Sequence, residues 1–347
     1  MLKTNFIKLL LGNLLVLLVL LVVVEVVLRL LNVGFGNTPL NPDPVFHHVH
    51  PNDYRYVSYS STGEYEGYEV YFDEKGRVAS PEGNSGADKP GKRAAFLGDS
   101  FTESLQVPFD SSFIALLDRA APEYATENYG VASYSPSLHY LTAKHKLLNG
   151  PAPPDKVFIM IYSNDVEDDR TYLKDAVHGT SGELEAINGG KPDRLVVLMR
   201  KSYLVRLLRK TLITIQYALD RERAESVAAA GVVGDYIEEI PTWEGSESAD
   251  YTLRTVRLLE SSGSEVYLTV VPSKYCHFNH NYDLEELSEK VEKWAATHDV
   301  RFIDLTAPFR LWREQNPDGK LFFEKDIHFN ETGHAVVAAT LLPYLRN

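Results

Sequence analysis

The chain has 347 residues, 44% hydrophobic and 24% charged, an ordinary globular composition that excludes a fully disordered protein. Its formal net charge of -13 excludes nucleic acid as an expected partner, because binding to phosphate depends on cationic contacts. The single cysteine, Cys276, excludes an intramolecular disulfide, a four-thiolate zinc site and a Cys-x-x-Cys redox pair.

The first element in chain order is an apolar segment. Residues 9–24 contain no charged side chain, and the apolar run continues to Leu31 through Glu25 and Arg29. At about 1.5 Å per residue a helix of this length spans roughly 30 Å, the thickness of a hydrocarbon core. Glu25 and Arg29 are four residues apart on one helical face, where they can pair near the interface. Residues 1–36 are therefore predicted to be a single transmembrane anchor.

A cleaved signal peptide is the alternative for this segment. It would need a short apolar region and an Ala-x-Ala type of cleavage site. The residues after the run are Asn32-Val33-Gly34-Phe35-Gly36, with no lipobox cysteine. Lys3 and Lys8 precede the run, so the positive-inside rule predicts a cytoplasmic N-terminus. We expect the remainder to be extracytoplasmic, in the periplasm or the extracellular space.

Residues 37–92 are rich in Pro, Gly, Tyr and Ser and are predicted to form a stalk with a small β decoration. A hairpin is expected from Glu69 to Val78, because Asp73-Glu74-Lys75-Gly76 is favourable turn chemistry between two β-type runs.

Residues 93–347 alternate short apolar runs with amphipathic segments, the pattern of a parallel α/β sheet. Strands are predicted at residues 94–97, 126–129, 157–162, 266–271 and 301–305. Helices are predicted at residues 111–120, 136–148, 283–297 and 331–345. Residues 166–265 interrupt this alternation for longer than a simple crossover needs, so they are interpreted as a helical insertion.

The insertion contains one predicted helix from about Leu195 to Glu225, rich in Leu, Ile and Val. It carries the cations Arg200, Lys201, Arg206, Arg209 and Lys210. Three alternatives stay open: the helix packs on the sheet with a solvated basic edge, lies against anionic lipid, or caps the cleft.

The strongest candidate for chemistry is Gly98-Asp99-Ser100, at the carboxyl end of the first predicted strand, where sites of open α/β sheets form. Gly98 allows a tight turn that can expose the Ser100 hydroxyl and point its N–H into the same cavity. A serine nucleophile also needs a base and an acid. His328 and Asp326, in a loop just before the last predicted helix, are the candidates.

With these residues the sequence resembles the SGNH (GDSL-like) hydrolase superfamily, named for its Ser, Gly, Asn and His blocks. The middle blocks are matched by Asn128-Tyr129-Gly130-Val131 and by Tyr162-Ser163-Asn164-Asp165, and the resemblance covers residues 92–345. It implies a three-layer α/β/α fold with a flavodoxin-like parallel sheet, here preceded by one transmembrane helix.

The resemblance implies two-step acyl transfer, with Ser100 as nucleophile, His328 as base and Asp326 as the acid that orients it. The oxyanion hole would consist of the N–H groups of Ser100 and Gly130 and the side-chain amide of Asn164. No cofactor and no metal are implied.

Two positions depart from the family's pattern. Tyr162 stands where the third block usually has glycine, which changes the wall beside Asn164. Asp326 is two residues before His328 rather than three, as in alginate O-acetyltransferase-like relatives, and position 325 is Lys. The Gly-x-Ser-x-Gly motif of α/β-hydrolases does not occur in the sequence.

The other histidines are interpreted as structural. His47, His48 and His50 form one group and His277 and His280, beside Cys276, another, but neither has the spacing of a metal site. His334 is expected to pack or cap within the last helix.

We therefore expect an anchored esterase that removes O-acyl groups, such as acetyl, from a glycan or a small ester. An O-acyltransferase acting on an exported polysaccharide would use the same residues, and a catalytically idle assembly or binding protein would keep the same fold. The expected partners are membrane lipid, through the N-terminal helix, and the acyl ester.

Overall fold

The computed structural model describes residues 2–31, 40–60, 63–82, 91–150, 152–191, 193–195, 199, 201–212, 215, 242–274 and 285–347. The chain divides into two compact units, which are described separately. The smaller unit comprises Met1–Pro39, Val57–Tyr68 and Pro192–Tyr236, and the larger comprises Leu40–Tyr56, Glu69–Lys191 and Ile237–Asn347.

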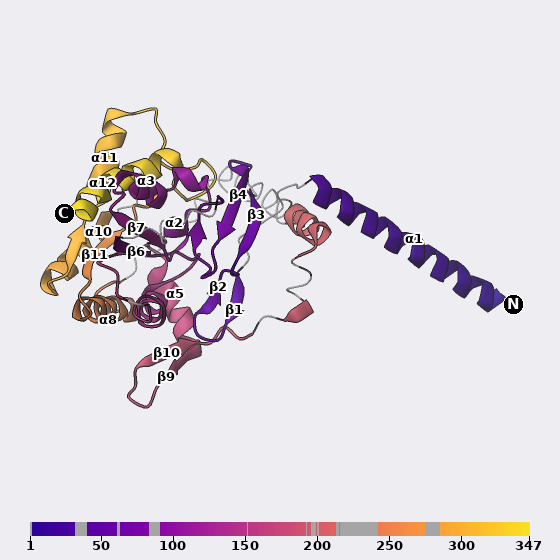
Figure 1. Ribbon diagram of the computed structural model, residues 1–347, viewed down its shortest axis with the longest axis horizontal. Coiled ribbons are helices and arrows are strands. Elements are labelled where there is room, and N and C mark those ends of the chain that lie inside the picture. Colours follow the sequence, from indigo (N-terminus) through magenta and orange to yellow (C-terminus); the bar gives the residue numbers. More distant parts are fainter. Residues whose placement is uncertain are drawn as a thin grey trace, which may run out of the picture. The chain divides into compact units, whose positions relative to one another are not determined.

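The larger unit is built on a five-stranded parallel sheet with the strand order β12-β11-β8-β6-β7. Figure 1 labels β6, β7 and β11 of this sheet. The strands are β6 (Lys92–Leu97), β7 (Tyr124–Asn128), β8 (Lys156–Ile161), β11 (Glu265–Val270) and β12 (Arg301–Ile303). The strand β6 pairs with β7 on one side and with β8 on the other, so the order in which the chain adds strands reverses next to β6. Flavodoxin-like sheets have the same reversal. The five predicted strands and the predicted fold class are confirmed.

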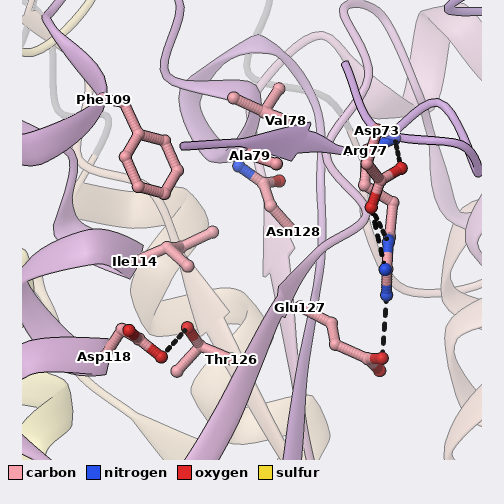
Figure 2. A pocket seen from close by; sticks show the side chains of 10 residues that line it. All are labelled: Asp73, Arg77, Val78, Ala79, Phe109, Ile114, Asp118, Thr126, Glu127 and Asn128. Atoms are coloured by element: carbon pink, nitrogen blue, oxygen red, sulfur yellow. Dashed lines mark hydrogen bonds and ion pairs between the residues drawn. The ribbon is translucent and has the colours of Figure 1, made fainter. Parts of the chain in front are cut away.

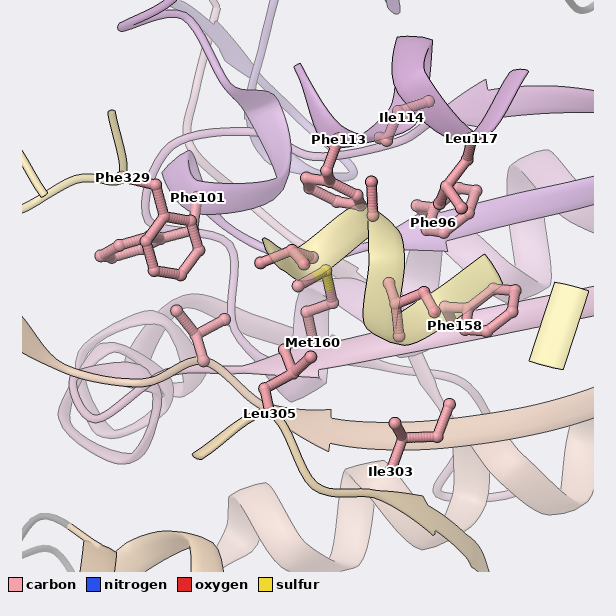
Figure 3. Packing of buried hydrophobic residues seen from close by; sticks show 14 of the residues in the cluster. Phe96, Phe101, Phe113, Ile114, Leu117, Phe158, Met160, Ile303, Leu305 and Phe329 are labelled. Atoms are coloured by element: carbon pink, nitrogen blue, oxygen red, sulfur yellow. The ribbon is translucent and has the colours of Figure 1, made fainter. Parts of the chain in front are cut away.

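Successive residues of β6 and β8 point to opposite faces of the sheet, and each face buries its own core. Phe96 and Phe158 stack at 4.9 Å in the first core, which also contains Phe113 and Leu117 (Figure 3). That face is covered by α3 (Phe113–Ala120), α11 (Thr306–Gln315) and α12 (Glu331–Arg346).

The opposite face buries Ala95, Leu97, Val157 and Ile159. It is covered by α4 (Pro136–Thr142) with the π-helical turn Ala143–Leu147 that continues it, by α8 (Glu247–Ser261) and by α10 (Glu285–Thr297). The result is a three-layer α/β/α unit. Because its strands are parallel, their carboxyl ends all lie at the same edge of the sheet. The four predicted helices are confirmed, with ends shifted by a few residues.

The predicted insertion, residues 166–265, is partly an ordinary component of the larger unit. It begins within α5 (Asp165–Tyr172) and continues into a hairpin of β9 (Ala176–His178) and β10 (Leu184–Ile187). Its last helix, α8, packs on α4 and is the crossover that leads into β11. A purely helical insertion is therefore wrong for these residues.

The segment before β6 contains β1 (Asn41–Asp43), β2 (His47–Val49), β3 (Tyr54–Tyr59), β4 (Glu66–Phe72) and β5 (Val78–Ala79). The predicted hairpin is confirmed, with Phe72 opposite Val78 and Gly76 in the left-handed region at φ 72°. Residues expected as a stalk, from Leu40 to Tyr56 and from Glu69 onward, belong to the larger unit.

A buried ion network ties this β segment to the sheet. Arg77 donates to Asp73 and to Glu127 of β7, each at 2.8 Å, beside a small cavity (Figure 2). All three side chains are at least nine-tenths buried. Arg93 also donates to Glu127, at 2.7 Å, so each charge in the network has an opposite partner.

The smaller unit contains α1 (Leu2–Leu31) and a helix at residues 203–212. Within α1, the stretch Phe6–Leu31 has 26 residues and contains an 18-residue window with a mean hydropathy of 3.1. It is long and apolar enough to cross a membrane, although a signal sequence has the same properties. Lys201 and Ser202 are not helical, so one uninterrupted helix from Leu195 is wrong. The predicted part beyond residue 215 lies outside the described residues.

Candidate active site

The turn after β6 presents Ser100 at the first position of a short helix, α2 (Ser100–Glu103). A Cβ on Gly98 would lie 2.1 Å from Thr102 Oγ1, so only glycine fits this turn. The Asp99 carboxylate accepts the Phe101 N–H at 2.9 Å and caps the helix. No described residue accepts the Ser100 N–H, which leaves this donor available beside its own hydroxyl.

His328 connects Ser100 with Asp326. Its Nε2 lies 2.7 Å from Ser100 Oγ, and its Nδ1 lies 2.5 Å from Asp326 Oδ1. An ionised carboxylate can only accept, so Nδ1 carries the proton and Nε2 accepts the serine hydroxyl. Asp326 Oδ1 also accepts the His328 backbone N–H at 3.0 Å. The structure thus brings three predicted site residues into one hydrogen-bonded chain.

The loop that carries Asp326 is held at both ends. Lys274 Nζ donates to the carbonyl oxygens of Glu324 and Asp326, at 2.6 and 3.0 Å. On the other side Asn330 caps α12, with its Oδ1 accepting the Gly333 N–H at 3.0 Å. The imidazole is therefore positioned by a short loop with fixed ends.

An aromatic wall lies next to the imidazole. The Phe101 ring is 4.8 Å from the His328 ring and 4.5 Å from the ring of Tyr162, and both aromatic residues are buried. Tyr162 is the residue that departs from the family's glycine. Its ring packs against Phe101 and forms part of the wall, and the contact between Ser100 and His328 is present beside it.

Asn164 precedes α5 and has its amide oriented by the same helix. Its Nδ2 donates to Asp168 Oδ2 at 2.7 Å, while its Oδ1 is buried without a hydrogen-bond partner among the described residues. One hydrogen of the amide is committed to Asp168 and the other is left for a ligand. Sequence reasoning missed Asp168, although its spacing of four residues on a helix was readable.

Gly130 lies against the nucleophile turn. A Cβ there would meet Glu103 N at 2.3 Å, so the close approach of the two loops requires glycine. The Gly130 N–H donates to Asn128 Oδ1 at 2.9 Å, so the role predicted for it needs this bond to be exchanged for one to substrate.

Ser133, in the same loop, was not anticipated. It adopts the left-handed conformation at φ 61°, and its N–H has no partner among the described residues. The loop is fixed nearby, because Val131 donates to the Gly98 carbonyl at 3.2 Å and Ala132 to Glu103 Oε1 at 3.2 Å. Position 133 is not a glycine, so the sequence gives no indication of the left-handed conformation of Ser133.

Buried carboxyl groups surround this part of the site. Burial raises the pKa of Asp99 to about 6. Burial and the nearby charges of Asp99 and Asp169 raise the pKa of Asp168 to about 7, and burial raises that of Asp165 well above its ordinary value. The ionised forms of these three carboxyl groups are disfavoured, which limits the negative charge beside the Asn164 amide.

The described histidines among those interpreted as structural from the sequence have packing or hydrogen-bond partners. His334 is buried between Phe113 and Phe329, and burial lowers its pKa to about 3; the prediction that it packs is confirmed. His48 Nε2 lies 2.8 Å from the Ala132 carbonyl oxygen, and His50 Nε2 lies 2.5 Å from Glu103 Oε1. The group around Cys276 lies outside the described residues.

Comparison with known proteins identifies the type of domain. Residues 96–336 match the GDSL-like Lipase/Acylhydrolase family. No curated protein matches the chain significantly.

Solved structures with a similar arrangement are distant in sequence. A member of the lipolytic protein G-D-S-L family from Veillonella parvula is 15% identical and covers 74% of this chain and 100% of its own, with a TM-score of 0.44. The acetyl xylan esterase AlAXEase is 16% identical and covers 73% and 99%, with a TM-score of 0.43. A variant of an acetyl xylan esterase from Geobacillus stearothermophilus is 15% identical and covers 73% and 94%, with a TM-score of 0.41. Sequence identities and TM-scores as low as these carry no information about the substrate of this chain.

Proposed function

We propose that this chain, which belongs to the GDSL-like Lipase/Acylhydrolase family, is a membrane-anchored serine esterase that hydrolyses O-acyl esters with Ser100 as its nucleophile. Membership of the family makes the chain an ester-bond hydrolase. The observation that supports the assigned nucleophile is the chain of hydrogen bonds from Ser100 Oγ through His328 to Asp326. Such a chain gives a weakly nucleophilic hydroxyl a base within reach.

In the first step His328 Nε2 takes the proton of Ser100 Oγ, which attacks the ester carbonyl carbon. The tetrahedral oxyanion accepts hydrogen bonds from the Ser100 N–H and the uncommitted hydrogen of the Asn164 amide. The loop 130–133 supplies a further backbone donor, either Gly130 after release of Asn128 or Ser133 directly.

When the intermediate collapses, His328 returns the proton to the leaving alkoxide and the alcohol departs. Water then loses a proton to the same imidazole, attacks the acyl-serine and releases the carboxylic acid and the free Ser100 hydroxyl. Asp326 keeps Nδ1 protonated and stabilises the imidazolium in both steps. Ester and water thus become acid and alcohol with no other reactant.

The proposed substrate class is O-acyl esters, acetyl esters in particular, of a glycan or of a small molecule. The Asp326–His328 spacing, which resembles that of alginate O-acetyltransferase-like proteins, also favours a second candidate in which a sugar hydroxyl replaces water as acceptor. Product analysis separates the two: free acetate alone indicates the esterase, and acetylated oligosaccharide indicates the transferase.

For the location, we propose that α1 remains as an anchor, with a cytoplasmic N-terminus and an extracytoplasmic larger unit. The charges that support this orientation are Lys3 and Lys8. A reporter fused after Asn347 should be active only outside the cytoplasm, and a signal from a reporter that works only in the cytoplasm would reverse the orientation.

The test of the activity is hydrolysis of p-nitrophenyl acetate by the full chain in detergent. Ser100→Ala should reduce the rate to background, whereas Ser261→Ala, which removes an exposed serine on α8, should leave it unchanged. Equal rates for the parent and Ser100→Ala would refute Ser100 as the nucleophile.

A further inference from the structure

The helix at residues 203–212 begins on the side chain of a residue of α1. Glu25 accepts the backbone N–H groups of Tyr203 and Leu204, at 3.1 and 2.9 Å, and the Ser202 hydroxyl at 2.8 Å. The first N–H groups of a helix have no partner within it and form its positive end. Glu25 therefore caps this helix from a distant part of the chain.

Arg29 completes the junction. Its Nε donates to Glu25 Oε1 at 2.7 Å, its Nη2 donates to the Lys201 carbonyl oxygen at 2.9 Å, and its guanidinium lies 5.3 Å from the Tyr203 ring. Glu25 and Arg29 of α1 thus bond both to each other and to residues 201–204. These bonds hold the start of the helix against the end of the anchor.

The position of Glu25 along α1 sets the depth of this junction. Glu25 follows Phe6, the first residue of the apolar stretch, by 19 positions, which is roughly 30 Å along the helix axis. A hydrocarbon core is about 30 Å thick, so Glu25 reaches the far interface when Phe6 is at the near one. Residues 202–204 therefore start at the interfacial level.

The helix itself is amphipathic. Leu204, Leu208 and Leu212 are spaced by four residues along one side, and Ile215 continues the row. The last three are 56%, 67% and 51% exposed. The opposite side carries Arg206, Arg209 and Lys210.

The charge of this region is opposite to that of the chain as a whole. Between Asp193 and Asp220 the sequence has six Lys or Arg residues and no Asp or Glu, whereas the whole chain has a net charge of -13. A local excess of cations beside an apolar row is complementary to an anionic lipid surface, where the row enters the acyl region and the cations reach phosphate.

We propose that residues 203–212 form an interfacial helix that lies on the anionic phospholipid surface on the extracytoplasmic side, docked to the anchor through Glu25 and Arg29. This inference rests on the proposed membrane anchor and is independent of the proposed catalytic residues. The helix gives the chain a second, in-plane attachment to the bilayer next to its transmembrane one.

The test uses the full chain with Cys276→Ser, reconstituted into vesicles of phosphatidylcholine and phosphatidylglycerol. An environment-sensitive fluorophore is attached at Leu212→Cys, or at Arg209→Cys on the opposite side as the matched control. A third label at Leu17→Cys reports on α1. Quenching by lipids that carry a spin label in the acyl chain should be strong at 17 and 212 and several-fold weaker at 209.

Two further variants test the contacts. Glu25→Leu should weaken quenching at 212 while that at 17 stays. Replacing Arg206 and Lys210 with Glu should weaken the quenching at 212, more strongly at low salt than at high salt because salt screens the attraction to anionic lipid. The same replacement should have little effect in vesicles of phosphatidylcholine alone.

Each contrary result has its own meaning. Equal quenching at 212 and 209, with 17 quenched, overturns the interfacial helix and leaves the anchor. Absence of quenching at 17 overturns the anchor and the helix together. Ester hydrolysis that survives in Ser100→Ala, with strong quenching at 17 and 212, overturns the catalytic proposal and leaves the interfacial helix in place.

Discussion

The amide nitrogen of Asn164 lies 2.7 Å from the carboxylate of Asp168, one helical turn further along α5. This contact fixes the rotation of the amide and leaves a single N–H for an oxyanion. Through this contact the ionisable carboxyl group of Asp168 is hydrogen-bonded directly to the Asn164 amide, which is the proposed donor to the oxyanion.

Asn164→Ala should lower kcat for p-nitrophenyl acetate by about a hundredfold, because an oxyanion donor acts only when charge develops in the transition state. KM should change little, and the unfolding temperature should stay close to that of the parent. Steady-state kinetics and thermal unfolding on the same preparation test this. A kcat within twofold of the parent's would exclude Asn164 from the oxyanion hole.

Asp168→Ala should lower kcat by at least about tenfold, because the unrestrained Asn164 amide loses its alignment. The neighbouring Glu167, whose side chain is 72% exposed, provides the control, and Glu167→Ala should leave kcat unchanged. If Asp168→Ala and Glu167→Ala lowered kcat equally, the loss would result from the changed charge of α5 and not from misalignment of the Asn164 amide.

Asp168 should also make stability depend on pH. Its pKa, raised to about 7, exceeds that of an unfolded aspartate, about 4, so the folded state binds this proton more tightly. Between these values unfolding releases the proton, and the free energy of unfolding contributed by this group falls as pH rises.

Asp168→Asn removes this dependence. The variant should therefore gain stability relative to the parent as pH increases from 4 to 8, measured by denaturant unfolding at each pH. A stability difference that is constant over this range would show that Asp168 does not titrate there.

Arg77→Met should destabilise the larger unit by about 3 to 5 kcal/mol, because it leaves buried carboxylates without this partner. Arg119, whose side chain is 52% exposed and pairs with Asp110, is the matched control, and Arg119→Met should cost less than about 1 kcal/mol. Urea unfolding of the two variants measures the difference, and similar values for both would contradict a structural role for the network around Arg77.

Much of the fold could be predicted because strand runs such as residues 157–162 are short continuous apolar segments, the pattern of strands buried on both faces of a parallel sheet. The helix α8 escaped prediction because its buried side includes Ser248, Thr252 and Thr255, which weaken the apolar pattern. Of these groups, the Ser248 hydroxyl donates to Asp169 at 2.6 Å and the Thr255 hydroxyl to the Tyr251 carbonyl of the same helix, at 2.7 Å, whereas the Thr252 hydroxyl has no partner among the described residues.

The site shows the same division. Ser100, His328 and Asp326 could be proposed because each follows a strand or precedes a helix at the same sheet edge. The left-handed Ser133 and the bond from Gly130 to Asn128 could not, since they depend on how two loops meet. Likewise the junction of Glu25 with residues 202–204 joins segments that lie far apart in the sequence.

The proposed activity depends on Ser100 being a nucleophile that His328 activates. The most direct measurement is mass spectrometry of the full chain after treatment with a small fluorophosphonate. We predict a single covalent adduct on the peptide that contains Ser100, absent in Ser100→Ala and formed far more slowly in His328→Ala. An adduct on another serine, or ester hydrolysis that survives in Ser100→Ala, would show that Ser100 is not the nucleophile.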